Sequence, residues 1–488
     1  MSYTLTDLFC GAGGSSTGAV SVPGMSVRVA SNHWELAIQT HNTNHQDADH
    51  ICADLSQIDP RYFPATDLLW ASPECTNHSR AKGRKKDTMQ VALWGESLPD
   101  AAAERSRATM WDVPRFAETH RYKAVLVENV VEAVDWLPFR AWLMAMDALG
   151  YDHHIVSLNS MHAQAYGLPA PQSRDRLYIA FWRKGNRGPD FAGMQRPKAY
   201  CPSCDKVVHA IQAWKRPGTV AGRYRSQYLY RCPKTSCRGQ QVEPGWLPAA
   251  SIIDWTLKGQ RIGDRAKPLA AKTRARIAAG IARYWGDPFL TEHVHEYRVR
   301  EITRPTPTIV AQGNHVGLAI PVEGRADVNR ARTLEDPLRT QNTPLETGLA
   351  YPPFVAELRG GGSTARPVAD PLATVTASGN HHALVMRNNT GGAEMVTPVT
   401  EPVRTITTAG HQSVLTADDI AKAAKHVDDV MFRMLEPSEC KRAMAFPADY
   451  VMLGNRREQI RLAGNAVTPP AARDLIHTVI DALEGTAA

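Results

Sequence analysis

The 488-residue sequence contains no uninterrupted apolar run of about 18 residues, the length that a membrane-spanning helix requires, so we expect no membrane-spanning segment. Residues 1–14 also lack the basic head and the long apolar stretch of a secretion signal. In a chain without such a signal, eight cysteines do not indicate a disulfide framework. We therefore expect a cytoplasmic protein with no membrane partner.

The composition is close to that of ordinary globular proteins. Apolar residues make up 43% of the chain and charged residues 22%, which excludes wholesale disorder. The net charge of +7 is unevenly distributed, because residues 196–285 hold 18 lysines and arginines against four acids. This basic surplus predicts either a polyanionic partner for one module, such as a nucleic acid, or simply a solvated basic surface.

Apolar runs alternate with amphipathic stretches in the first 184 residues. The runs predicted as buried strands are residues 4–9, 27–31, 67–72, 123–129, 153–158 and 176–181. Residues 36–42 and 139–149 are predicted as helices between them. This alternation predicts an α/β fold with a doubly wound, mostly parallel sheet. Such sheets bind ligands beyond the carboxyl ends of their strands.

The composition changes near residue 185 and again near residue 429. Residues 185–428 are rich in glycine, proline and basic residues, and residues 429–488 return to helical patterning. Between about 304 and 416 a P-x-x-T pattern occurs four times, at Pro305/Thr308, Pro337/Thr340, Pro371/Thr374 and Pro402/Thr405. These β-rich repeats are either strand-and-turn scaffolding or polar turns that face base edges.

A glycine-rich turn, CGAGG at residues 10–14, follows the first predicted strand. Glycines let the backbone turn sharply and let a ligand approach closely, while the helix that follows offers free N–H groups. The turn lacks the G-x-x-x-x-G-K-[ST] pattern that cradles phosphates. It therefore indicates a nucleoside-like cofactor rather than a triphosphate, although glycine turns also occur for packing alone.

Two cysteine pairs lie within the basic module. Two residues separate Cys201 from Cys204, four separate Cys232 from Cys237, and 27 lie between the pairs. Four thiolates at this spacing are typical of a tetrahedral zinc site without an open position for catalysis. We predict a structural zinc ribbon over about 199–240, with four unliganded thiols as the alternative.

Six short motifs near the two ends of the chain occur in a characteristic order. They are DLFCGAGG (7–14), SPECTNHS (72–79), ENV (128–130), QSRDR (172–176), RMLEPSECKRAMAFP (433–447) and GNAVTPP (464–470). By these motifs the chain resembles the DNA (cytosine-5)-methyltransferase family. The middle of the chain, which is variable in that family and carries target recognition, matches only by position.

The resemblance implies a division of the chain and a set of partners. Residues 1–184 would form the catalytic and cofactor-binding domain, 185–428 the target-recognition domain, and 429–488 a segment that completes the catalytic domain. The implied fold is that of S-adenosylmethionine-dependent methyltransferases, and the implied partner is double-stranded DNA. A cognate restriction endonuclease in the same system, a solitary enzyme and viral protection all remain open as the biological role.

The resemblance also implies which residues hold S-adenosylmethionine. Phe9 and the glycine turn would line the pocket, Trp34 would lie against the adenine, and Asp54 would accept a hydrogen bond from its amino group. The full set carried over is Phe9, Gly11, Ala12, Gly14, Trp34, Asp54, Leu55, Asn465 and Val467. At the position of the family's ribose-binding acid this chain has His33, followed after Trp34 by Glu35, so either side chain is a candidate for that contact.

The same motifs contain groups suited to methylation of cytosine carbon 5. Cys75, in the family's catalytic position, would add as a thiolate to carbon 6 of a flipped-out base and make carbon 5 nucleophilic. Glu128 would act at N3 as an acid or hydrogen-bond donor. Arg174 and Arg176 alternate along one strand, so they would face the same side, where they could fix the base carbonyl and orient Cys75 or Glu128. A surface salt bridge is the alternative.

One departure from the family pattern lies beside the nucleophile. The family has proline immediately before the cysteine, whereas this chain has Glu74, and an inward-facing carboxylate would disfavour the thiolate. We expect activity to survive. Residues 80–86, with five basic side chains in seven, would contact phosphates if the loop closes over DNA.

Three other functions compete with DNA methylation. An RNA cytosine-5 methyltransferase would use the same chemistry. A catalytically silent DNA-binding relative is the second alternative, because Glu74 and His33 depart from the residues that the family has at these positions. A cysteine hydrolase using Cys75 and His78 would leave the glycine turn and the distant GNAVTPP motif unexplained.

Overall fold

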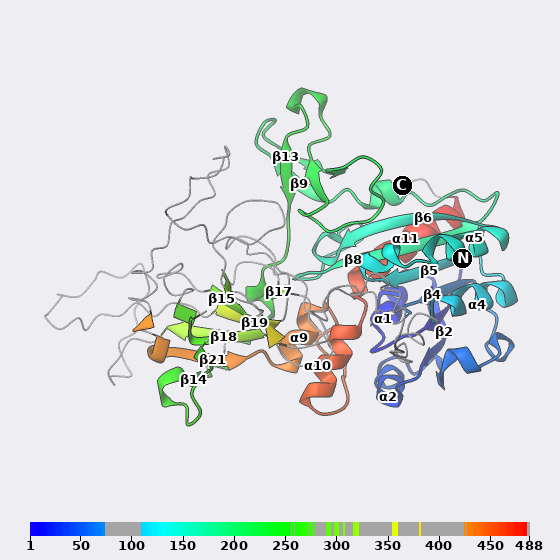
Figure 1. Cartoon of the computed structure of the whole chain (residues 1–488). Helices are drawn as coiled ribbons and strands as arrows, with labels where there is room; N and C mark the ends of the chain where they lie inside the picture. Colours follow the sequence, from blue (N-terminus) through cyan, green and yellow to red (C-terminus); the bar gives the residue numbers. More distant parts are fainter. Residues whose placement is uncertain are drawn as a thin grey trace, which may run out of the picture.

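The structure is a computed structural model of the chain, shown in Figure 1. It describes residues 1–73, 109–254 and 427–485, together with short stretches at 256–257, 259–271, 273–275, 277–278, 289–293, 297–301, 306–307, 316–321, 354–359, 380–381 and 424–425. Among the helices so described, none has the length and apolar character needed to cross a membrane.

A seven-stranded sheet forms the centre of the larger lobe. In spatial order its strands are β3 (Asp49–Cys52), β2 (Met25–Asn32), β1 (Tyr3–Leu8), β4 (Leu68–Ala71), β5 (Ala124–Asn129), β8 (Asp175–Arg183) and β6 (Tyr151–Asn159). The strands from β3 to β5 run parallel to one another. All six predicted strands are present, and the mostly parallel α/β sheet is confirmed.

One strand of the sheet, β8, runs in the opposite direction to the other six. β8 is antiparallel to both β5 and β6. A parallel pair needs a long crossover connection, usually a helix. The segment between β6 and β8 holds only the short 3-10 helix Ser160–His162 and the two-residue strand β7 (Gln172–Ser173), so the chain turns back beside itself.

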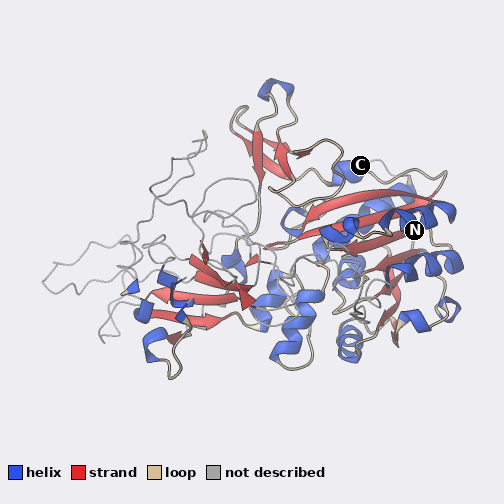
Figure 2. Cartoon of the chain, viewed as in Figure 1, coloured by secondary structure: helices blue, strands red, loops and turns tan. Residues whose placement is uncertain are grey.

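Helices cover both faces of this sheet, as Figure 2 shows. On one face β5 and β8 pack with α1 (Gly14–Val20) and α11 (Pro469–Glu484), whereas α4 (Asp112–His120) and α5 (Phe139–Ala148) cover the other face. Helices α2 (Glu35–Asn44) and α5 confirm the two predicted helices. A Cβ atom on Gly18 would lie 2.5 Å from the carbonyl oxygen of Pro469, so α1 and α11 approach closely. The far end of the chain thus packs against the first helix of the sheet lobe.

A five-stranded antiparallel sheet follows the large one in sequence. Its spatial order is β10 (Lys206–His209), β9 (Lys198–Cys201), β13 (Gln241–Pro244), β12 (Tyr228–Arg231) and β11 (Ile211–Trp214). We call residues 198–244 the cysteine ribbon. In Figure 1 its strands β9 and β13 stand above the large sheet.

A third sheet lies in the smaller lobe. It contains β14 (Gln260–Arg261), β15 (Phe289–His293), β16 (Tyr297–Glu301), β18 (Val316–Pro321), β19 (Phe354–Arg359), β20 (Asn380–His381) and β21 (Val430–Met434), while β17 (Thr306–Pro307) pairs with β7. β21 follows the boundary predicted at residue 428, yet it pairs with β14 and β18. The prolines and threonines of the P-x-x-T pattern lie outside the described residues.

Candidate functional site

The carboxyl ends of β1 to β5 meet along one edge of the large sheet. The glycine turn begins there, and Phe9, Gly11 and Gly13 all have left-handed backbones, with φ of 58°, 52° and 83°. Such angles favour glycine, so Phe9 is held in a strained conformation. The strand before the turn is linked to the helix after it, because Ser15 and Ser16 both donate hydrogen bonds of 2.6 Å to Asp7 Oδ2.

The residues predicted to contact the cofactor follow the ends of neighbouring strands. Trp34 caps α2 after β2, and one face of its ring has the guanidinium of Arg461 at 4.3 Å. Asp54 follows β3, and its Oδ1 accepts hydrogen bonds from the backbone and hydroxyl of Ser56, at 3.1 and 2.8 Å. The neighbouring Leu55 is buried. The predicted contacts with adenine remain predictions.

The two candidates for the ribose contact lie beside Trp34. Both His33 and Glu35 are exposed. Glu35 Oε1 accepts a hydrogen bond of 3.0 Å from Gln39 Nε2 on the next turn of α2. The arrangement therefore leaves both side chains as candidates.

The C-terminal motif GNAVTPP covers the glycine turn. Helix α10 (Arg456–Asn465) ends within this motif, and Asn465 is exposed. The carbonyl oxygen of Val467 would lie only 1.9 Å from a Cβ atom on Gly14, so no side chain fits there. Tyr450 donates a hydrogen bond to the carbonyl of Ala12.

The turn is open at Gly11 as far as the described residues show, because a Cβ there would meet none of their atoms within 4 Å. Accessible glycine backbone beside a half-buried tryptophan ring suits a flat nucleoside, so these residues fit S-adenosylmethionine.

An ion pair lies at the end of β5. Arg176 Nε is 2.8 Å from Glu128 Oε1, and the two side chains are only 10% and 11% exposed. A cation this close compensates the charge of the buried carboxylate. Arg174 donates to the carbonyl oxygens of Gly464 and Ala466, at 3.2 and 2.9 Å, and so joins the start of β8 to the C-terminal motif.

The segment that leads to the predicted nucleophile begins beside this ion pair. Asn129 Nδ2 donates to the carbonyl of Pro73 at 3.4 Å, which ties the chain after β4 to the residue next to Glu128. Cys75, Glu74 and the basic stretch 80–86 lie outside the described residues. Their predicted roles therefore remain predictions.

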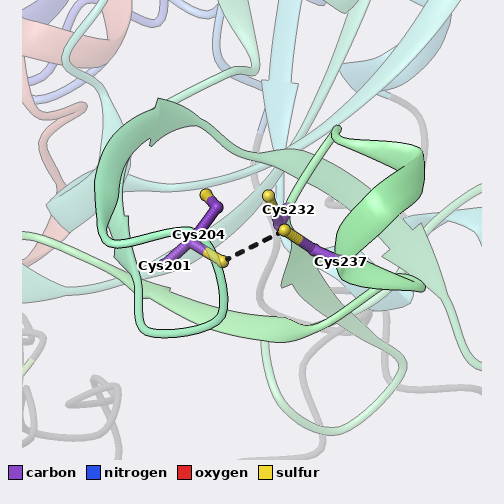
Figure 3. A group of neighbouring side chains, drawn as sticks. All are labelled: Cys201, Cys204, Cys232 and Cys237. Carbon is purple, nitrogen blue, oxygen red and sulfur yellow. Dashed lines mark hydrogen bonds between the residues drawn. The ribbon is translucent and has the colours of Figure 1, made fainter.

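The four paired cysteines come together in the cysteine ribbon (Figure 3). Their sulfur atoms all lie within 4.8 Å of one another, and those of Cys201 and Cys237 are 3.9 Å apart. In a tetrahedral site with zinc–sulfur bonds of about 2.3 Å, neighbouring sulfurs are about 3.8 Å apart. The donor set and its spacing therefore fit a structural zinc ion.

The tyrosines between the cysteine pairs have a structural role that the sequence did not reveal. The basic, tyrosine-bearing composition of residues 222–231 alone would suit a DNA contact, but Tyr224, Tyr228 and Tyr230 are all buried. Tyr224 and Tyr230 pack edge-on against the ring of His162, which follows β6. These side chains therefore form the core of the ribbon and its junction with the large sheet.

Comparison with known proteins identifies the family. The model of the family described as C-5 cytosine-specific DNA methylase matches residues 3–214 and 353–481, well over half of the chain. The chain belongs to this family. Its large sheet is accordingly the methyltransferase fold that the motifs implied.

Individual members of the family are more distant. The type II methyltransferase M.AgeI of Thalassovita gelatinovora is 30% identical over 195 residues, which cover 37% of this chain and 40% of the relative. M1.ScrFI of Lactococcus lactis subsp. cremoris is 28% identical over 36% of this chain and 41% of its own. The chain thus spans about two fifths of the length of these relatives.

A longer match and a solved structure extend the comparison. M.NlaX of Neisseria lactamica is 25% identical over 55% of this chain and 78% of its own. A crystal structure of DNMT2 of Spodoptera frugiperda aligns with 98% of this chain and all of its own, at 12% identity and a TM-score of 0.46.

Proposed function

We propose that this protein transfers a methyl group from S-adenosylmethionine to carbon 5 of cytosine within a specific sequence of duplex DNA. The observation that carries the proposal is the buried Arg176–Glu128 pair at the end of β5, beside the segment that continues to Cys75. The family membership and the glycine turn support it independently. The relatives named above are type II methyltransferases, which favours a DNA substrate.

The chemistry requires each group to act on a cytosine flipped out of the duplex. The thiolate of Cys75 forms a bond to carbon 6, and the electron pair displaced from the C5–C6 double bond is accommodated at N3, which takes a proton from the protonated carboxyl group of Glu128. Arg176 holds Glu128 in place and compensates the charge of the carboxylate that remains. S-adenosylmethionine, when bound at the glycine turn, would supply the methyl group for carbon 5 and would leave as S-adenosylhomocysteine. Water then takes the proton from carbon 5, the cysteine sulfur leaves carbon 6 as a thiolate, and N3 returns its proton to Glu128, which restores the aromatic ring.

The middle of the chain would recognise the target sequence, and the cysteine ribbon would bind structural zinc. Four sulfur ligands complete a tetrahedral shell and leave no position open for water or substrate. The ion would therefore stabilise the ribbon without entering the reaction. A restriction endonuclease of matching specificity is the partner that the type II relatives favour.

Covalent trapping on duplex DNA that contains 5-fluorocytosine tests the proposal. Fluorine cannot leave carbon 5 as a proton does, so we expect a stable protein–DNA adduct that requires S-adenosylmethionine. Cys75→Ser, which removes the thiol, is the matched control. The substrate should carry every sequence context, because the target is unknown.

Three results would overturn the proposal. Absence of any adduct from the natural chain would favour the silent relative, and an adduct that persists in C75S would assign the nucleophile elsewhere. An adduct formed only on the corresponding RNA would favour RNA methylation. Bisulfite sequencing of DNA from cells that express the chain would report the methylated sequence.

A further inference from the structure

The cysteine ribbon contacts β8, the strand that carries Arg176, on the face of the sheet opposite to the Arg176 side chain. Along β8, alternate side chains face opposite sides of the sheet. Tyr178 belongs to the core beneath α1 and α11, on the side of Arg176, whereas Leu177 belongs to the core beneath α4 and α5, on the side of Asp175. The ribbon approaches from the second side, where Ala221 packs against the same core as Leu177.

Three consecutive ribbon residues make polar contacts at this place. Gly222 donates its backbone N–H to Ser157 Oγ on β6 at 3.0 Å, and Tyr224 donates its own to Asp175 Oδ1 at 3.0 Å. Between them, Arg223 forms an ion pair with Glu132. We call residues 222–224 the ribbon latch.

The acids that the latch holds are placed next to the proposed reaction groups. Asp175 immediately precedes Arg176, and Glu132 lies in the 3-10 helix Val131–Asp135, which follows Glu128 by a few residues. Both acids are buried, at 7% and 8% exposure, so each needs a partner that compensates its charge or its hydrogen-bonding capacity. The latch provides a partner for each.

Among the strands that the structure describes, only β6 pairs with the start of β8. The last residue pair between β5 and β8 is Asn129 with Leu177, whereas β6 continues to pair with β8 as far as Asp175. Arg176 therefore lies beyond the end of its ladder with β5. Backbone at the end of a hydrogen-bond ladder opens more easily than backbone inside it. The contacts of the ribbon latch should therefore affect the position of β8 most strongly at this end.

We infer that the ribbon latch positions Arg176 against Glu128, and that Arg223 is its principal positioning residue. The middle module then has a second role besides recognition: it fixes the spacing between β8 and the segment after β5. This inference rests on the proposed function, because it names the geometry on which that function depends. A displacement of about 1 Å in such a geometry can lower a rate by roughly a hundredfold.

The variant Arg223→Gln tests the inference, with Lys206→Gln as its matched control. Both variants remove one positive charge from the ribbon, but Lys206 lies exposed on β10, away from the latch. We expect R223Q to lower kcat by about tenfold or more, with KM for DNA changed less than about threefold. Lys206→Gln should leave kcat unchanged. Arg223→Lys, which restores the charge, should recover part of kcat.

A measurement without turnover separates this inference from the proposed function. Hydrogen exchange of the amides in residues 172–178 and 128–132 should accelerate severalfold in R223Q and not in K206Q. Glu132→Gln breaks the same ion pair from the other side and should reproduce the acceleration, which guards against a folding defect peculiar to one variant.

The inference would be overturned if hydrogen exchange were unchanged in both R223Q and E132Q. It would also be overturned if R223Q and K206Q raised KM equally and left kcat unchanged. If the natural chain transfers no methyl group, the proposed function fails, while the exchange experiment still decides whether the latch holds β8.

Discussion

Replacement of Glu439 by alanine should destabilise the protein more than its position on a short surface-facing helix suggests. Glu439 lies in α9 (Pro437–Ala443) and is fully buried. Its carboxylate accepts two hydrogen bonds of 2.7 Å from the guanidinium of Arg433 on β21. It accepts two more of 2.7 Å from the backbone N–H groups of Glu436 and Asp254. One side chain thus joins three segments of the chain.

The expected loss in the free energy of unfolding follows from the polar groups that lose their partner when Glu439 is truncated. Arg433 is 10% exposed, and of its described partners it would keep only the carbonyl oxygens of Leu257, Met434 and Asp254. The backbone N–H groups of Glu436 and Asp254 would lose their acceptor. Breaking a buried ion pair from one side costs roughly 3–5 kcal/mol, and we expect about 4 kcal/mol for E439A. Urea unfolding measures this loss. Glu439→Gln, which keeps an acceptor oxygen, should lose less.

The exposed ion pair of Arg456 with Glu436, at the start of the same helix, provides a control. Breaking it with Arg456→Gln should cost less than about 1 kcal/mol, because exposed pairs contribute little. The reasoning would be refuted if E439A lost under about 1 kcal/mol or no more than R456Q did.

Three further predictions concern the metal, the cofactor turn and pH. The purified chain should hold one zinc ion, and its chelation or Cys232→Ser should abolish hydrogen-exchange protection in residues 198–244; an intact, protected ribbon without metal would contradict this. Gly14→Ala, whose Cβ would collide with Val467, should destabilise the chain by about 1–3 kcal/mol and weaken S-adenosylmethionine binding in calorimetry. Gly245→Ala, whose Cβ would meet no described atom within 4 Å, should change neither the stability nor the binding. Burial raises the pKa of Asp7 to about 6, so its contribution to stability is complete below a pH of about 4 and lost as pH rises past about 6. Asp7→Asn should therefore lose less stability between pH 4 and pH 7.5 than the natural chain in thermal unfolding; an equal loss would show that this carboxyl does not titrate as described.

The elements that could be predicted are those whose pattern is local. The strand that ends at Glu128 is apolar along its length, and the cysteine spacing alone indicated which four thiols would meet. Strand β3 was missed because it is half-exposed and has no apolar run. The antiparallel direction of β8 was missed because hydrophobic periodicity does not record which way a strand runs.

The contacts that could not be predicted join residues far apart in sequence. Arg223 and Glu132, or Arg433 and Asp254, carry no local signal of their pairing. The tyrosines of the ribbon illustrate the opposite error, since their basic surroundings favoured an exposed role although all three are buried. The basic composition of the cysteine ribbon therefore gave no indication that its tyrosines form a buried core.

The contact of Gly14 with Val467 sets an order of events during synthesis of the protein. The turn emerges from the ribosome early, but the residues that cover it are translated only after the whole middle module. The site proposed for the methyl donor can therefore be completed only after the middle module has been synthesised. Under the proposed function, a nascent chain that still lacks the middle module also lacks a covered donor site.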